Sequence, residues 1–136
     1  MLRNALSKRL VRHGVGRMKT LNLLAASELP DGFTYPKQFC HAVDLGLMNL
    51  EPWYLIEGEE LRKTFAGLRE RYQGRKLIPF ARRQDNDDIA CWDVQSDLVI
   101  VVIHDFASPG WEQRGRFECF WDWFRQAVED MIEFDT

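Results

Sequence analysis

The sequence has few cysteines and no long hydrophobic run, and these two absences exclude several classes of protein. Its 136 residues contain only three cysteines, Cys40, Cys91 and Cys119, which are far apart and embedded in apolar strings. They form no CxxC or Cys/His pattern, so neither a zinc site nor a disulfide-stapled scaffold is expected. No apolar run approaches the ~20 residues that a membrane-spanning helix needs. We therefore expect reduced, buried thiols in a cytoplasmic protein without a membrane span.

The N-terminal segment lacks acidic residues and the features of a secretory signal. Its first twenty residues carry six basic side chains and no acid, but they have no long apolar stretch followed by a small-residue cleavage site. Apolar residues at helical spacing predict a short amphipathic helix that ends near Gly14 or Gly16 and docks on the core rather than binding lipid or nucleic acid. A second helix is expected from Met18 to Ser27. Residues 1–28 are thus predicted to be a helical N-terminal extension, in which Met18 offers an alternative start.

Motifs for catalysis and cofactor binding are also missing. The Gly-x-Gly at residues 14–16 neither follows a strand nor continues to a third glycine, so nucleotide binding is not expected. Ser108 lacks the Gly-x-Ser-x-Gly elbow of hydrolases. The histidines share no motif, and a general base needs a positioned partner and a cleft. We expect no enzymatic activity, no catalytic residue, no metal and no cofactor.

What the sequence does contain is the pattern of one ordinary globular domain. A length of 136 residues, 46% hydrophobic and 29% charged, is typical of a single domain over residues 1–136. Helices are expected over 36–47, 59–72 and 117–132, and strands over 52–56, 76–81, 89–94 and 98–104. The run Leu98–Ile103 is apolar on both faces and belongs in the sheet centre, covered on both sides, whereas Pro79 favours an edge or bulged position. We predict an α+β fold with a largely antiparallel or mixed sheet of about four to six strands packed with helices.

Charge is distributed unevenly between the two parts of the chain. Residues 1–84 hold 15 basic and 8 acidic side chains, whereas residues 85–136 hold 3 basic and 13 acidic ones. Such asymmetry can create a polar field that orients a charged partner. Alternatively, folding interleaves the two parts and pairs many of these charges. The overall pI of about 5.6 disfavours nucleic acid as the main ligand.

The acidic loop at residues 84–88 is the first candidate site. Asp85, Asp87 and Asp88 could hold a hard cation through carboxylate oxygens. The calcium-loop pattern nevertheless fails, because Ile89 and Ala90 stand where it needs an acid or Asn and then Gly. Asp and Asn are also the ordinary residues of a turn between strands, so a hairpin connection is the stronger interpretation, and contact with a partner is compatible with it.

Aromatic residues are the second candidate, since five tryptophans and nine phenylalanines are many for this length. Trp is enriched at binding hot spots because it buries a large area at low entropy cost. Trp111 lies in a loop beside Gly110 and Glu112 and is the best candidate for exposure. Trp123, at the edge of the apolar stripe of the last helix, is the second. The alternative for both is an ordinary core position.

Three segments carry a resemblance to a known family. They are Leu29-Pro30 followed by Tyr35 and Phe39, then Leu77–Ala81, which is similar to an apolar-Pro-Phe-Ala strand, and Asn86–Asp93, which is similar to a Gly-Asp-x-x-Cys-x-Asp turn and strand. These motifs resemble those of the SUKH superfamily, which includes a yeast cell-wall-synthesis regulator and many bacterial immunity proteins. They occur in the family's order over roughly residues 29–134. Asp87 stands where the family usually has glycine, and the Asn-Gly pair after the early helix is missing.

The resemblance implies a binding domain rather than an enzyme. Bacterial members typically neutralise a cognate toxin, often a nuclease, by direct association. We therefore expect a protein partner, which could be a basic toxin domain because complementary charge speeds association. The alternatives are a housekeeping interaction or regulatory domain without a toxin partner, and a small metal-dependent hydrolase that uses Asp85, Asp88 and His104. The predicted partner-binding residues are Asp85, Asp87, Asp88, Asp105, Trp111, Glu112 and Trp123.

Overall fold

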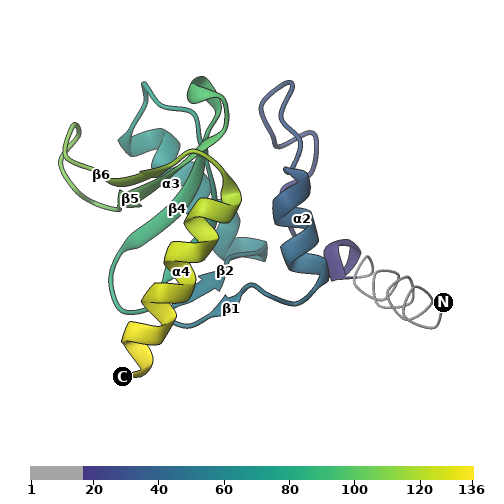
Figure 1. Cartoon of the computed structure of the whole chain (residues 1–136). Coiled ribbons are helices and arrows are strands. Elements are labelled where there is room, and N and C mark those ends of the chain that lie inside the picture. Colours follow the sequence, from purple (N-terminus) through teal and green to yellow (C-terminus); the bar gives the residue numbers. More distant parts are fainter. Residues whose placement is uncertain (1–16) are drawn as a thin grey trace.

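The computed structural model describes residues 17–136, and the helix predicted before Gly14 lies outside them. The helices are α2 (Lys37–Asp44), α3 (Gly58–Arg71) and α4 (Phe120–Asp135), with a 3₁₀ turn at Val94–Ser96. The strands are β1 (Asn49–Leu50), β2 (Trp53–Leu55), β3 (Leu77–Arg83), β4 (Asp88–Asp93), β5 (Val99–His104) and β6 (Gln113–Phe117). They form one six-stranded sheet in sequence order, each strand antiparallel to the next. The predicted α+β class with a largely antiparallel sheet is confirmed (Figure 1).

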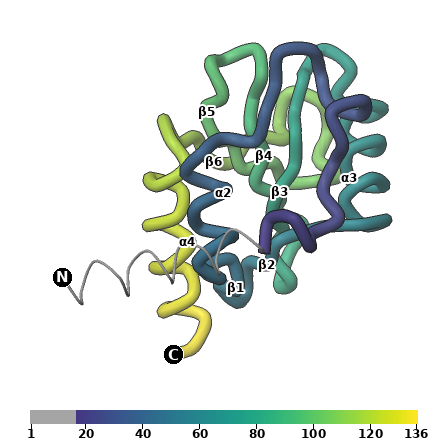
Figure 2. The backbone as a smooth tube through the Cα atoms, turned by 90° about the vertical axis from the view of Figure 1, so that its right-hand side faces the viewer, coloured from purple at the N-terminus to yellow at the C-terminus, as the bar shows by residue number. Residues whose placement is uncertain are grey.

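The sheet is covered on both faces, with α2 and α4 on one side and α3 on the other (Figure 2). The alternation of side chains along β5 explains this arrangement, since successive residues of a strand point to opposite faces. Ile100 and Val102 belong to the larger core cluster under α2 and α4, whereas Val99, Val101 and Ile103 belong to the cluster that includes Leu68 and Tyr72. The cover predicted for both faces of this strand is therefore confirmed, whereas its predicted place at the sheet centre is taken by β3 and β4, and β5 lies one strand from the edge.

The larger core cluster is built around aromatic rings that contact one another, mostly edge to face. Trp92 of β4 lies 4.4 Å from Phe80 of β3 and 5.0 Å from Phe39 of α2, measured between ring centroids. Phe80 in turn lies 4.9 Å from Trp123 of α4, whose ring is 5.4 Å from that of Trp53 in β2. Edge-to-face pairs at these separations add to the stability that burial alone provides. The aromatic residues thus join both helices of this layer to three strands.

Trp123 corrects one prediction directly, because only 1% of its surface is exposed. It was placed at the edge of the helix stripe, but the helix turns so that Phe120, Trp123 and Ala127 face the sheet. Ile132, near the end of the same helix, is 49% exposed. The inward face of α4 is the one whose Trp123 ring packs against Trp53 and Phe80 of the sheet. Trp123 is a core residue and presents no surface to a partner.

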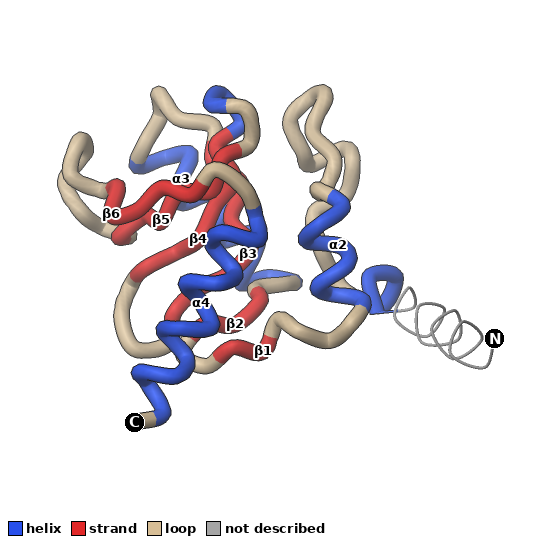
Figure 3. The backbone as a smooth tube through the Cα atoms, in the orientation of Figure 1, coloured by secondary structure: helices blue, strands red, loops and turns tan. Residues whose placement is uncertain are grey.

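The structure differs from the sequence predictions at two further places. Helical backbone is present only over residues 17–20 of the helix predicted from Met18 to Ser27, and turns follow. Tertiary partners replace the helical bonds there, since Tyr35 accepts a bond from the Leu24 amide and Arg62 donates to the Leu23 carbonyl. Strand β6 was not predicted, because its sequence Gln-Arg-Gly-Arg-Phe shows no apolar alternation. Figure 3 shows it as the strand that completes the sheet beside β5.

Pro79 occupies a bulge, one of the two positions predicted for it. Its strand β3 lies between β2 and β4, so the alternative of an edge strand is wrong. The register jumps from Pro79 opposite Cys91 to Ala81 opposite Ala90, which leaves Phe80 as the extra residue. A bulge tolerates proline because the ladder is already interrupted there.

We expect Trp123→Ala to lower the free energy of unfolding by about 3–5 kcal/mol, because it empties the space between Trp53, Phe80 and Phe120. The matched control is Trp111→Ala, which removes a ring that is 82% exposed and should change stability by no more than about 0.5 kcal/mol. Urea denaturation of both variants measures the difference. A small loss for Trp123→Ala would show that α4 does not depend on this ring.

Candidate partner-binding surface

The loop from Asp105 to Glu112 connects β5 to β6 and presents two aromatic rings to solvent. Trp111 is 82% exposed and Phe106 is 67% exposed, the two largest exposures among the bulky hydrophobic residues of the described chain. The exposure predicted for Trp111 is confirmed. The sequence does not predict that Phe106 is exposed. The course of this loop depends on β6, which the sequence does not predict as a strand.

Asp105 anchors the start of this loop instead of facing solvent. Only 3% of the residue is exposed, and its carboxylate lies 2.5 Å from Nη2 of Arg71 on α3. The same carboxylate accepts a hydrogen bond from the Phe106 amide at 2.9 Å. Phe106 has a φ of +66°, in the left-handed region that costs an ordinary L-residue of order 1–3 kcal/mol. The Arg71 guanidinium lies 4.3 Å from the centroid of the Phe106 ring and helps to hold it there.

Glu112 anchors the other end of the loop in the same way. Its carboxylate accepts bonds from Nη1 of Arg75 at 2.7 Å and from the Gly110 amide at 2.6 Å. Burial raises the pKa of Glu112, but these bonds outweigh it and hold the pKa below its usual range. The Tyr72 hydroxyl donates to the Ala107 carbonyl at 3.1 Å, so α3 also supports the middle of the loop. Asp105 and Glu112, predicted as partner contacts, are therefore buried anchors of the loop.

The loop at residues 84–88 is a tight hairpin connection, the stronger of the two interpretations of its sequence. The Asn86 side chain accepts a hydrogen bond from the Asp88 amide at 2.8 Å, which closes the turn. Asp85 accepts two bonds from Arg83, at 2.8 and 2.9 Å, and these bonds lower the pKa of its carboxyl. Asp87 is the most exposed of the three acids, with 57% of its side chain accessible and Arg82 3.9 Å away.

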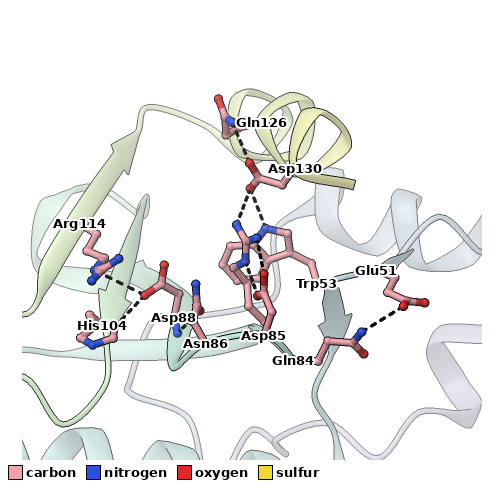
Figure 4. Close-up of polar contacts among 11 residues, drawn as sticks. Glu51, Trp53, Gln84, Asp85, Asn86, Asp88, His104, Arg114, Gln126 and Asp130 are labelled. Atoms are coloured by element: carbon pink, nitrogen blue, oxygen red, sulfur yellow. Dashed lines mark hydrogen bonds and ion pairs between the residues drawn. The ribbon is translucent and has the colours of Figure 1, made fainter. Parts of the chain in front are cut away.

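Asp88 lies between His104 and Arg114, as Figure 4 shows, and lines a groove. His104 Nδ1 lies 3.0 Å from the Asp88 carboxylate and Arg114 Nε lies 3.7 Å from it. Asp85 is committed to Arg83 (2.8 Å), so the three residues of the hydrolase alternative do not converge on one point. Within residues 17–136, no group of three or more His, Cys, Asp or Glu side chains is placed to hold a metal ion. The groove, of about 440 Å³, reaches from Asp88 and Arg114 to Asp130 on α4.

Some of the acidic side chains beyond residue 84 pair with arginines of the basic part of the chain. Six carboxylates beyond residue 84 lie within 4 Å of arginines before it: Asp85 and Asp130 with Arg83, Asp87 with Arg82, Asp93 and Glu112 with Arg75, and Asp105 with Arg71. Asp130 also accepts a 2.9 Å bond from the Trp53 indole (Figure 4). The two parts of the chain are therefore interleaved at these six carboxylates, as the alternative predicted, while the polar-field interpretation stays a prediction for the remaining acids.

None of the three cysteines is placed as a nucleophile. All are free thiols, and Cys91 is completely buried in β4. Burial raises the pKa of Cys91 and, to a lesser degree, that of the half-buried Cys40, so both remain protonated at neutral pH. The described helices include none that is long and apolar enough to cross a membrane.

No protein-family model, curated protein or solved structure matches the chain. The motifs that resemble the SUKH superfamily fall on definite parts of the fold. The apolar-Pro-Phe-Ala segment is β3 with its bulge, and the Asp-rich turn leads into β4. Both motifs therefore lie on the two strands that carry Phe80 and Trp92, the centre of the aromatic core.

We expect Glu112→Gln to lower the free energy of unfolding by about 1–2 kcal/mol at pH 7, because Arg75 loses the charge that compensates its burial. The folded-state pKa of Glu112 is lowered, so this contribution is present above the unfolded-state pKa and is lost as the pH falls through the folded-state pKa. Urea denaturation of wild type and variant, from pH 7 downward, should show the difference shrinking in acid.

The matched control is Glu118→Gln, whose carboxylate is 74% exposed and pairs with Arg116 at the surface. Exposed pairs of this kind contribute little, so the control should differ from wild type by less than about 0.5 kcal/mol. Equal losses in the two variants, or a Glu112→Gln penalty that grows in acid, would contradict the anchoring role of Glu112.

Proposed function

We propose that the chain is a protein-binding domain of the SUKH type that recognises its partner mainly through Trp111 and Phe106. The observation that carries this proposal is the pairing of two exposed rings with a loop whose ends are buried and bonded. Trp111 is 82% exposed and Phe106 is 67% exposed, while Asp105 and Glu112 fasten the loop to α3. A ring held in place before binding loses little entropy when a partner covers it.

The strained backbone at Phe106 supports the same proposal. A phenylalanine in the left-handed region is unfavourable by itself, and here an ion pair and a cation–π contact hold it in position. The Phe106 ring belongs to neither core cluster, and the residue is 67% exposed. A costly conformation that exposes an apolar ring is best explained by contact with another molecule.

Fewer acidic residues are available to contact a partner than the sequence suggested. Asp88, Asp105 and Glu112 are buried and paired, which leaves Asp87, and to a lesser extent Asp85, as acids that could touch a partner. These pairs leave fewer acids near the aromatic loop to recognise a basic nuclease than the sequence count alone suggests. Toxin neutralisation remains the finer proposal and rests on the resemblance. A housekeeping interaction domain would use the same surface for a different partner.

The test is affinity capture from the native cell with wild type and with Phe106→Ala/Trp111→Ala. If both rings are hot spots, the double variant should bind the captured protein at least about 30-fold more weakly, by calorimetry on the purified pair. Ile132→Ala/Phe134→Ala is the matched control, since it removes two partly exposed apolar side chains from the end of α4.

Unchanged affinity in the loop variant would overturn the assignment of the surface. Recovery of no partner at any salt concentration would count against binding as the function. If the captured protein is a toxin encoded by a neighbouring gene, co-expression of wild type should restore growth, whereas the loop variant should fail to do so.

A further inference from the structure

A cleft of about 470 Å³ lies between the segment Ser27–Asp31 and helix α3, apart from the loop that carries Trp111. Its volume is within the range of pockets that bind small molecules. Apolar side chains from four parts of the chain line it: Leu29, Pro30, Phe65, Leu77 and Val94. Leu77 is almost fully buried and forms part of the floor, while Phe65 is half-buried in the wall. The cleft therefore offers an apolar interior that connects with the core.

The wall formed by Ser27–Asp31 is held in place by one arginine of α3. Arg62 binds both oxygens of the Glu28 carboxylate at 2.8 Å, and it also donates to the Leu23 carbonyl at 3.2 Å. The hydrogen bond from Arg62 lowers the pKa of Glu28. Bidentate pairs of this kind define geometry as well as attraction. Because Arg62 ties the segment to one end of α3, the cleft further along the helix is present before any ligand arrives.

Some charged side chains around the cleft form ion pairs within the protein, and others do not. Glu28 is bound to Arg62, and Arg75 is bound to Glu112 and lies 3.5 Å from Asp93. Arg69 and Lys76 are both exposed at the cleft, and within residues 17–136 neither forms an ion pair with an acid. Asp31 is the one further carboxylate among the lining residues.

The position of Arg69 places a cation beside an aromatic wall. Arg69 follows Phe65 by one helical turn, and its guanidinium carbon lies 5.5 Å from the centroid of the Phe65 ring. Guanidinium groups bind carboxylates and phosphates through two parallel N–H donors, and the ammonium of Lys76 adds a second charge. An anion bound here would have an apolar surface directly behind it.

We propose that this cleft binds a small organic anion, with its carboxylate or phosphate at Arg69 and Lys76 and its apolar body against Phe65, Leu77 and Val94. This site is separate from the protein-binding loop and does not depend on it. An apolar ligand without charge would leave the two cations unused, and an inorganic anion would leave the apolar walls unused. Both parts are needed for full affinity.

The experiment is an NMR titration of the full-length ¹⁵N-labelled chain with four probes: phenyl phosphate, phenylacetate, benzyl alcohol and inorganic phosphate. We expect phenyl phosphate or phenylacetate to shift the amide signals of Leu29, Phe65 and Val94 in a saturable way. Benzyl alcohol and inorganic phosphate should each bind at least about tenfold more weakly than the better organic anion, since each lacks one of the two contacts. The preferred probe distinguishes a carboxylate from a phosphate ligand.

Arg69→Gln and Lys76→Gln should each weaken binding of the better probe by about three- to tenfold. Lys63→Gln is the matched control, because Lys63 is an exposed cation of α3 that does not line the cleft. The amide spectrum away from the cleft checks that each variant is folded. The proposal is overturned if neither organic anion shifts these signals, if inorganic phosphate binds as tightly, or if Lys63→Gln weakens binding equally. None of these results would affect the assignment of Trp111, which the capture experiment tests.

Discussion

Ion pairs between the two parts of the chain are the interaction on which the rest of the structure depends. Arginines at the end of α3, just after it and in β3 form ion pairs with carboxylates of the later hairpin, loop and final helix. Several of these carboxylates are almost fully buried, and a buried charge without a partner is strongly unfavourable. The later segments can therefore pack in few ways other than against these arginines. Such pairs need not add much net stability, but they do select one arrangement.

This constraint also determines what is left on the surface. Since Asp105 and Glu112 are used to fasten the loop between β5 and β6, the loop presents aromatic rings rather than carboxylates. The acids nearest to the loop in sequence are thus structural, and the rings between them are the groups available for recognition.

Helix α3 connects the two surfaces to which the proposals refer. Its C-terminal end and the residues just after it hold the aromatic loop through Arg71 and Arg75, while Arg62 on an earlier turn holds the segment over the cleft. Helix α3 and the turn after it thus position both regions, and Arg75 lines the cleft while it holds Glu112 of the loop. The aromatic core around Phe80 and Trp92 holds the opposite face of the sheet against α2 and α4.

The sequence by itself determined the class of the fold and its principal elements. The periodic stripe of α3 and the doubly apolar strand β5 follow from local pattern, because burial imposes a period of 3.6 or 2 on the residues that it selects. The sequence leaves two alternatives for each of Pro79 and Trp111, and the structure chose the bulge and the exposed position. The sequence does not predict strand β6, because β6 is a strand through its pairing with β5 and not through its own composition.

Only the tertiary structure decided which polar and aromatic residues face solvent. The sequence shows thirteen acids after residue 84 but not the distant arginines that pair with six of them. It places Trp123 at the edge of an apolar stripe, but contacts with Trp53 and Phe80 turn this residue into the core. These outcomes depend on contacts between residues far apart in the chain, and such contacts leave no signal in the local order of amino acids.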